Sequence, residues 1–368
     1  MSSKPRIKPA DAEDGRPVSI SARLGRLQFH YSGKFRVLQI ADIQDGPKVS
    51  KDTITLIEAS LDATRPDLVI FSGNQIAGYD PAFADSFRKR RWCNEPIAES
   101  ALNHTRALVR KAIGQFTEPL AARGIPWAVT YGNHDFQCGI LADEQDDLYR
   151  EFAGCMNPVA GSSPLALEPG TFALPIEASD GSGRITMSVM MVNSGDYADT
   201  ADAGDGNGRQ SVTEYAKYAA NSRGWDLADS DGYGTPSPEA VEWLKRVQRE
   251  LGRRNGDGQA VPAIAFQHIP PQEFYDCLRE VPAYTPNAVE GAREFAGHCY
   301  VLDRDVCRPG SRLGEAIGCA DVNVGEVDAL REAGGYFALF CGHDHKNAFV
   351  GHVHDIDLGY APTCGFEC

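Results

Sequence analysis

The stretch that decides the fold is "IPWAVTYGNHD" at residues 125–135, where three polar side chains follow an apolar run. The run is typical of a buried strand. Asparagine, histidine and aspartate directly behind a strand suit a tight turn, and they are also side chains that bind metal ions. A turn needs nothing else from the chain, whereas a metal site needs ligands from other segments. The remaining sequence therefore decides between the two interpretations.

Two earlier apolar runs end in the same way. They are "KFRVLQIAD" at 34–42 and "DLVIFSG" at 67–73, and polar residues follow both. Between the runs, Ser50 offers an N-cap to a helix that buries Ile57, and a second helix is predicted over residues 101–116. The order strand–helix–strand–helix–strand predicts a parallel sheet, and ligands bind beyond the carboxyl ends of such strands. We therefore expect the three strand ends to share one site.

The second half of the chain continues the alternation of strands and helices. Strands are predicted at 185–193, 261–270 and 335–345, and helices are predicted after Ser237 and near 325–333. Insertions are expected at about 198–235 and 271–334, where the sequence has no clear period. No linker divides the chain, so we expect a flexible polar arm over residues 1–30 and a single domain over residues 31–368.

Composition and charge limit the classes of protein to which the chain can belong. The 368 residues carry a formal net charge of -15, with 42% hydrophobic and 24% charged residues, which is typical of a globular protein. The acidic balance argues against a nucleic-acid or membrane-surface binder, since both need a basic surface. No apolar run is long enough to span a membrane, and the N-terminus lacks the apolar core of a secretory signal. Ten cysteines without a CxxC pair indicate reduced thiols and a cytoplasmic location.

The polar groups that end the predicted strands suit a metal site. Four of the nine histidines are among them, in three separate segments. A single residue of this kind has an ordinary structural explanation, but oxygen and nitrogen donors gathered from several strands predict a site for hard or borderline cations. The group consists of Asp42, Gln44, Asn74, Asn133, His134, His268, His343 and His345.

The order of these groups, D-x-Q, G-N, G-N-H-D, H-x-P and G-H-D-H, resembles the calcineurin-like metallophosphoesterases, whose pattern is D-x-H, G-D, G-N-H-[D/E], a lone histidine and G-H-x-H. The resemblance covers about residues 35–360. The stretches "ADIQDG", "GNQIAGYD" and "CGHDHKN" look most similar to the branch related to purple acid phosphatases and yeast-type cell-cycle metallophosphatases. The resemblance implies a four-layer α/β/β/α sandwich with two mixed sheets, and a site for two metal ions, Mn, Fe or Zn.

The resemblance also implies a role for each residue. Asp42, Gln44, Asn74 and His345 would surround the first metal ion, and Asn74 would bridge to a second ion completed by Asn133, His268 and His343. His134 would face the leaving group as an imidazolium paired with a nearby carboxylate. Asp135 would orient the ligand or catalytic histidines.

Two positions depart from the family pattern. Gln44 replaces the histidine of D-x-H, and its amide oxygen can still bind a metal ion. Asn74 replaces the aspartate that bridges the ions, so the site loses a negative charge between two cations, and we expect weaker occupancy, most of all at the first site. Three explanations stay open: a working enzyme with altered metal preference or with another carboxylate recruited, an impaired one-metal relative that binds phosphoesters, or an introduced substitution. The candidate carboxylates are Asp45, Asp80 and Asp196.

The activity expected from the resemblance is hydrolysis of a phosphoester by a metal-bound hydroxide, without a covalent intermediate. A phosphomonoester is favoured, on a phosphorylated small molecule or a phosphoprotein, because bound cations can neutralise the phosphate in an acidic protein. One alternative is a phosphodiesterase or nuclease, which the acidic surface disfavours. The other is a phosphoester-binding protein that is catalytically impaired because of Asn74. No membrane partner is expected.

Three smaller features have two interpretations each. The basic run "RKRRW" at 88–92 is a solvated face or a surface that meets a phosphorylated substrate. The interval 276–307 is a lid that sets substrate choice or a decorative insertion. His352 and His354 fall on one face of a strand by their period of two, and solvent exposure is favoured over a further metal site.

Overall fold

The structure of the chain, a computed structural model, describes residues 26–91, 96–198 and 232–366. Most of the predicted N-terminal arm and the centre of the first predicted insertion lie outside these ranges. The end of the arm lies against the body of the protein, because Gln28 forms a parallel bridge with Glu177 and Leu27 is buried.

The first sheet and its helices follow the predicted order. Strands β1 (Val37–Ile40), β2 (Leu68–Ser72) and β3 (Trp127–Thr130) pair in parallel in the order β1-β2-β3. Helix α2 (Lys51–Thr64) begins at Ser50, whose hydroxyl accepts a hydrogen bond from the Asp52 backbone N–H at 3.3 Å. The second crossover is helix α3 (Glu99–Ala121), and helix α4 (Ala142–Arg150) follows β3.

The second sheet has seven strands with mixed pairing. Its order is β12-β13-β11-β7-β6-β5-β4, and β6, β7, β11 and β13 run parallel while the other neighbours are antiparallel. The strands are β4 (Ala166–Glu168), β5 (Thr171–Glu177), β6 (Ile185–Met191), β7 (Ala263–Phe266), β11 (Tyr336–Cys341), β12 (Val350–Val353) and β13 (Ile356–Tyr360). Its helices are α6 (Pro238–Asn255), capped by Ser237 as predicted, and α7 (Glu326–Ala333).

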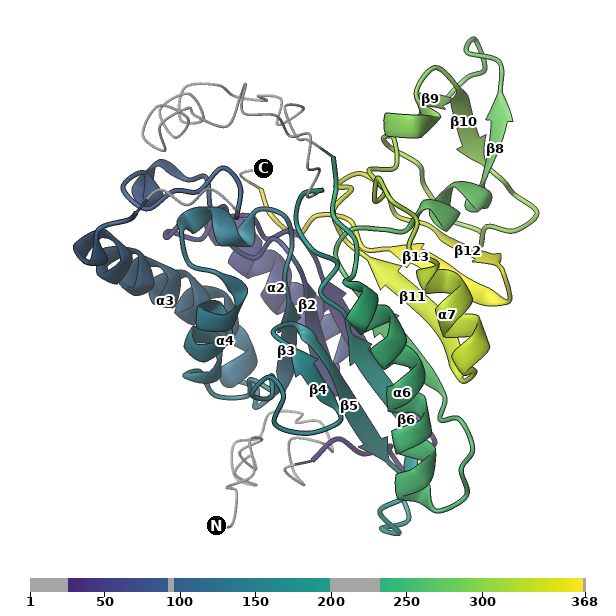
Figure 1. The fold of residues 1–368 in the computed structure, drawn as a ribbon, viewed down its shortest axis with the longest axis horizontal. Coiled ribbons are helices and arrows are strands. Elements are labelled where there is room, and N and C mark those ends of the chain that lie inside the picture. The colour runs from purple at the N-terminus through teal and green to yellow at the C-terminus, as the bar shows by residue number, and fades with distance from the viewer. Residues whose placement is uncertain (1–25, 92–95, 199–231, 367–368) are drawn as a thin grey trace.

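Three apolar clusters show that the elements form four layers (Figure 1). Between the sheets, Ile70 and Ala128 of the first sheet pack against Phe172 and Val189 of the second. On the outer face of the first sheet, Phe71 and neighbouring side chains pack against α2 and α3, and on the outer face of the second sheet α6 and α7 form a separate core. The predicted α/β/β/α sandwich is confirmed. Two mixed sheets were predicted, but the three strands of the first sheet all pair in parallel. Of the two large sheets, the second has mixed pairing.

A small third sheet was not predicted. Strands β8 (Leu278–Val281), β9 (Val289–Glu290) and β10 (Cys299–Leu302) form an antiparallel sheet in the order β8-β10-β9, joined to the body through the 3-10 helix η4 (Gln272–Cys277). It stands apart from the two large sheets (Figure 1). Its strands are too short to show a period in the sequence.

Three further predictions concern features away from the site. Within the described residues, no helix combines the length and apolar character that a membrane span requires. No disulfide forms among the eight described cysteines. His352 and His354 are exposed and pair with Asp357 and Asp276, which agrees with the prediction of a solvent-facing strand.

Candidate metal centre

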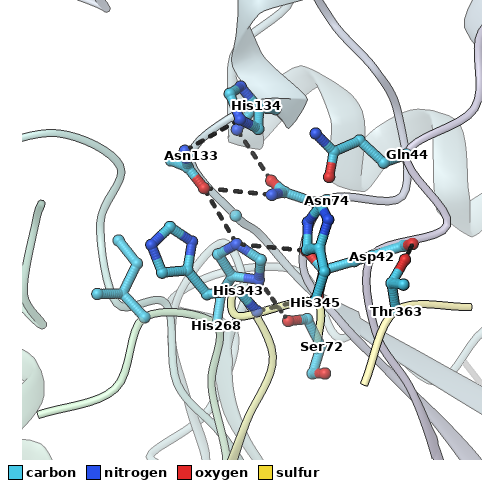
Figure 2. Close-up of polar contacts among 12 residues, drawn as sticks. Asp42, Gln44, Ser72, Asn74, Asn133, His134, His268, His343, His345 and Thr363 are labelled. Carbon is cyan, nitrogen blue, oxygen red and sulfur yellow. Dashed lines mark hydrogen bonds and ion pairs between the residues drawn. The ribbon is translucent and has the colours of Figure 1, made fainter. Parts of the chain in front are cut away.

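All eight polar residues predicted from the strand ends lie in one region of the structure, where the carboxyl ends of the parallel strands meet (Figure 2). Nε2 of His268 is 3.8 Å from Oδ1 of Asp42, and Nε2 of His345 is 3.6 Å from the same oxygen. The rings of His268 and His343 are 5.1 Å apart between centroids. The side chains of Asn133 and His268 meet at 3.1 Å. Residues more than 300 positions apart in the chain are therefore neighbours here.

The backbone is strained at half of these positions. Nine non-glycine residues with positive φ occur in the described part of the chain, and four of them are candidate site residues: Asp42 (51°), Gln44 (45°), Asn74 (52°) and His343 (79°). Such conformations cost roughly 1–3 kcal/mol each and persist only where the surroundings fix them, most often at functional sites. The strain is an indication of function that is independent of the side-chain chemistry.

Two glycines allow these side chains to approach the backbone closely. A Cβ on Gly132 would lie 2.2 Å from Oδ1 of Asn74, and a Cβ on Gly73 would lie 2.3 Å from Nδ1 of His268. Both distances are far inside van der Waals contact. The glycines of the G-N and G-N-H-D motifs are therefore required by the packing of the site.

Asp42 has one oxygen that forms hydrogen bonds and one that does not. Oδ2 accepts a hydrogen bond from the His343 backbone N–H at 2.9 Å, while Oδ1 is buried and has no hydrogen-bond partner among the described residues. Burial raises the pKa of Asp42, but attraction to His268 and His345 outweighs it and lowers the pKa to about 2. Asp42 therefore presents a negatively charged oxygen toward the histidines.

Gln44 is oriented in a similar way. Its Nε2 donates a hydrogen bond to the Tyr79 hydroxyl at 2.7 Å, which leaves Oε1 buried and without a hydrogen-bond partner in the described ranges. Because a buried, unsatisfied oxygen costs free energy, the arrangement fits a site that a cation completes.

Two backbone groups fix the orientations of Asn74, Asn133 and His268. The His134 backbone N–H donates to Oδ1 of Asn74 at 2.9 Å, so Nδ2 of Asn74 must point the other way and donates to Oδ1 of Asn133 at 3.2 Å. The carbonyl oxygen of Ser72 can only accept, so Nδ1 of His268, 2.9 Å away, carries the proton.

His268 and Asn133 consequently face each other through two acceptor atoms. Burial lowers the pKa of His268, although attraction to Asp42 opposes this, and in the neutral ring, whose proton lies on Nδ1, Nε2 carries a lone pair. That nitrogen lies 3.1 Å from Oδ1 of Asn133. Two acceptors at this separation repel each other unless a cation lies between them. This contact is a second place where the residues fit a metal ion.

His134 is held by Gln137, and the prediction of a carboxylate partner is wrong. Nδ1 of His134 lies 2.8 Å from Oε1 of Gln137, whose Nε2 donates to the Lys89 carbonyl oxygen at 3.3 Å. Because that carbonyl fixes the Gln137 amide, Nδ1 of His134 is the protonated nitrogen. Burial, with repulsion from His268, lowers the pKa of His134 to about 3. The expected imidazolium is therefore a neutral imidazole here.

Asp135 was predicted to orient histidine side chains, but it binds backbone N–H groups instead. Its Oδ2 accepts hydrogen bonds from the backbone N–H groups of Asn74 and Gly132, both at 2.8 Å, and its Oδ1 accepts from Ile76 at 3.0 Å. Burial raises the pKa of Asp135 to about 7, although the three backbone donors oppose this. Asp135 thus ties the loop after β3 to the loop after β2.

The carboxylates considered as replacements for the missing aspartate have other partners. Oδ2 of Asp45 accepts from the Ser50 backbone N–H, and Oδ1 of Asp80 accepts from the Ala82 backbone N–H. Asp196 pairs with Arg91 at 3.1 Å. Each of the three therefore has at least one oxygen that bonds to a group outside the eight site residues.

Several tyrosines at the site were missed by the sequence interpretation. Tyr79 packs edge-on against His134, with ring centroids 4.9 Å apart, and Tyr233 packs against His343 at 4.3 Å. The Tyr197 hydroxyl accepts a hydrogen bond from Nδ2 of Asn133 at 3.2 Å. Tyr79 lies in the stretch "GNQIAGYD", but none of the three tyrosines occupies a motif position that predicted a ligand, and their proximity depends on tertiary packing.

The donor set fits cations only when the amides are included. In residues 26–91, 96–198 and 232–366, no three His, Cys, Asp or Glu side chains form a group that would hold a metal ion by themselves. The centre instead combines one carboxylate with imidazoles and amide oxygens. The unsatisfied oxygens of Asp42 and Gln44, together with the facing acceptors of His268 and Asn133, are the observations that favour bound cations.

Comparison with known families and proteins gives consistent matches. A family model described as "Calcineurin-like phosphoesterase" matches residues 35–347. "Probable inactive purple acid phosphatase 29" of Arabidopsis thaliana is 21% identical over 95% of this chain and 77% of its own length. "Probable inactive purple acid phosphatase 28" of the same plant is 25% identical over 93% and 73%.

Two further similarities are more limited. "Phosphatase DCR2" of Saccharomyces cerevisiae is 30% identical over 135 residues, which is 33% of this chain and 19% of the yeast protein. A solved structure of a dimetal phosphatase from Danio rerio covers 90% of this chain and 88% of its own, with 12% identity and a TM-score of 0.47. That score is too low to carry an argument about function.

Proposed function

The chain belongs to the calcineurin-like phosphoesterase family, whose activity is metal-dependent, and we propose that it hydrolyses a phosphomonoester at the centre formed around Asp42 and His268. The proposed substrate is a phosphorylated small molecule or a phosphoprotein. The observation that carries the proposal is the convergence of buried acceptor atoms: the oxygens of Asp42 and Gln44 that have no hydrogen-bond donor among the described residues, and Oδ1 of Asn133, which faces Nε2 of His268.

The donor atoms divide into two groups. Asp42, Gln44 and His345 would hold one cation, and Asn133, His268 and His343 would hold another, with Mn, Fe or Zn as the proposed metals. When bound, the cations would neutralise the phosphoryl oxygens and lower the pKa of a coordinated water, which would then attack phosphorus. Asp42 supplies the formal negative charge of the group.

His134 would handle the proton of the leaving group. It holds its own proton at Nδ1 against Gln137 and presents Nε2 toward the centre, where Nδ2 of Asn133 lies 3.3 Å away. Nε2 could take up the proton that the attacking water loses and pass it to the departing oxygen. The protein thus fixes both the tautomer and the direction of this ring through Gln137.

A comparison of two chromogenic substrates tests the proposal. With Mn²⁺ added, we expect p-nitrophenyl phosphate to be hydrolysed faster than bis-p-nitrophenyl phosphate, and we expect EDTA to abolish both rates. Asp42→Ala should remove the activity, and His352→Ala, which changes an exposed histidine that pairs with Asp357 on the edge of the larger sheet, should leave it unchanged. Faster hydrolysis of the diester would favour the phosphodiesterase alternative.

A second candidate function is favoured by Asn74. Its Nδ2–H donates to Oδ1 of Asn133, and the two Arabidopsis relatives carry the word "inactive" in their names. The alternative is a protein that binds phosphoesters without hydrolysing them rapidly. Binding of inorganic phosphate without hydrolysis of either chromogenic substrate would support this alternative.

A further inference from the structure

Two buried thiols lie together where the small third sheet joins the body of the protein. Cys277 is the last residue of η4, and Cys307 follows β10. The thiol of Cys307 donates a hydrogen bond to the carbonyl oxygen of Cys277 at 3.3 Å. A Cβ on Gly351, in the neighbouring strand β12, would lie 2.5 Å from Sγ of Cys277 and 3.4 Å from Sγ of Cys307. Both sulfur atoms therefore lie against the same glycine.

The two cysteines mark the base of the small sheet. Strands β8, β9 and β10 all lie between them in the sequence, and the sheet stands apart from the two large sheets (Figure 1). The chain returns to the body beside the point where it leaves, because the Asp303 backbone N–H donates to the Cys277 carbonyl oxygen at 3.0 Å. A bond between the two sulfur atoms would thus close a loop that contains the whole sheet.

The same interval, residues 276–307, reaches the edge of the candidate metal centre. It includes the 3-10 helix η5 (Arg293–Phe295), and the guanidinium carbon of Arg293 lies 4.9 Å from the ring centroid of Tyr233. The Tyr233 ring packs edge-on against His343, with centroids 4.3 Å apart. One tyrosine therefore connects the inserted segment to a proposed metal ligand, which favours a functional role for the segment over a decorative one.

The two thiols differ in exposure and in acidity. Cys277 is fully buried, whereas Cys307 is 7% exposed. The hydrogen bond from the Cys277 thiol lowers the pKa of Cys307, and the same contact together with burial raises the pKa of Cys277. Because the thiolate is the form that attacks an oxidant, Cys307 is the nucleophile of the pair and Cys277 is the thiol that can react with it afterwards.

We propose that Cys277 and Cys307 form a reversible disulfide that holds the small sheet on the body of the protein when the chain meets a hydroperoxide. With hydrogen peroxide, the Cys307 thiolate attacks the O–O bond, becomes a sulfenic acid and releases hydroxide. The Cys277 thiol then attacks the sulfenic sulfur, and water leaves as the S–S bond forms. Two thiols are oxidised and one peroxide is reduced. The step needs neither a metal ion nor a phosphoester, so it goes beyond the proposed function.

Counting thiols tests the pair. The reduced full chain is treated with one equivalent of hydrogen peroxide, unfolded in urea and titrated with a chromogenic disulfide reagent. We expect the wild type to lose about two of its ten thiols and to regain them with dithiothreitol. Cys277→Ser and Cys307→Ser should each lose none. Cys299→Ser, which removes the cysteine of β10 in the same sheet, should lose two as the wild type does.

A peptide map of the oxidised wild type identifies the bond directly. Trypsin separates the three cysteines of this interval, because Cys277, Cys299 and Cys307 fall on the fragments 255–279, 294–304 and 305–312. After the remaining thiols are blocked with iodoacetamide, fragment 255–279 should be joined to fragment 305–312, and dithiothreitol should separate them. The map uses the wild type alone, so it decides the question even if a serine variant does not fold.

Three results would overturn the inference. They are no loss of thiols in the wild type, an equal loss in Cys307→Ser, and a map that joins either cysteine to a third one. A thermal melt tests whether the bond forms without distorting the fold. The oxidised wild type should melt at a higher temperature than the reduced protein, because a cross-link across a long loop restricts the unfolded chain. A lower melting temperature would show that the bond pulls the sheet out of its native position.

Discussion

At residue 74 an amide stands where the family has a carboxylate, and the change does more than remove a charge. The His134 backbone N–H fixes Oδ1 of Asn74, so the second position of the side chain presents an N–H toward Asn133. That N–H donates a hydrogen bond to Oδ1 of Asn133, an oxygen that a cation at the second position would need as a ligand. From the sequence we expected the weaker binding at the first metal position. These hydrogen bonds indicate instead that the second position is weakened most.

We predict that Asn74→Asp increases the amount of metal that the protein holds. After dialysis against Mn²⁺, elemental analysis should give about one equivalent for the wild type and about two for the variant, because the carboxylate supplies an oxygen and a negative charge in place of the N–H. The rate of p-nitrophenyl phosphate hydrolysis should rise with the metal content. An unchanged metal content would show that Asn74 is not the limiting defect.

His134→Ala should separate catalysis from metal binding. We expect turnover of p-nitrophenyl phosphate to fall about 100-fold or more, as is typical for loss of a general acid–base group. Metal content should stay constant, because the ring contacts Gln137 and Asn133 and not Asp42. If metal content fell as well, His134 would be a ligand and its proposed role would be wrong.

Among the structural elements, helix α7 carries a buried carboxyl group where it begins. Glu326 is 1% exposed, and its Oε2 accepts a hydrogen bond from Nε2 of Gln267, the residue before His268, at 3.0 Å. A carboxylate at a helix N-terminus is normally favoured by the helix dipole. Here burial dominates and raises the pKa of Glu326 to about 8.

Glu326 contributes stability that we expect the protein to lose as the pH rises. Its pKa is about 4.5 when unfolded and about 8 when folded, so the folded state binds more protons between these values. The contribution of this group to the free energy of unfolding should therefore fall between pH 5 and pH 8, by up to about 1.4 kcal/mol per pH unit, while the buried His134 and His268 contribute in the opposite direction below about pH 6.5. Asp135 and Asp344, whose pKa values burial raises to about 7, act in the same direction.

Glu326→Gln isolates the contribution of this one group. Denaturant unfolding at pH 5.5 and pH 7.5 should show a smaller loss of stability in the variant than in the wild type, while the slope due to Asp135 and Asp344 remains. An equal loss in both proteins would mean that Glu326 is ionised in the folded state at both pH values.

The elements could be predicted from the sequence where a period or a cap was present. The N-cap at Ser50 and the cap at Ser237 predicted the starts of α2 and α6, and the apolar runs predicted β1, β2, β3, β6, β7 and β11. The sheet of β8, β9 and β10 was missed because strands of two to four residues show no alternation.

For the whole molecule, the site residues could be predicted because parallel strands place their carboxyl ends together. The partners of those residues could not be predicted in the same way. Gln137 replaces a carboxylate as the partner of His134, and Arg90 reaches the site through Tyr197, and both contacts depend on how separate loops pack. Pattern and topology specify which side chains meet, and tertiary contacts specify their proton positions and charge.

The account depends on cations held by side chains from both sheets, and anomalous diffraction from crystals soaked in Mn²⁺ tests this most directly. We predict an anomalous peak within bonding distance of Asp42, with His268 or His345 as a further ligand. Diffraction that shows both histidines hydrogen-bonded to protein atoms, with no anomalous peak between them and Asp42, would contradict the account.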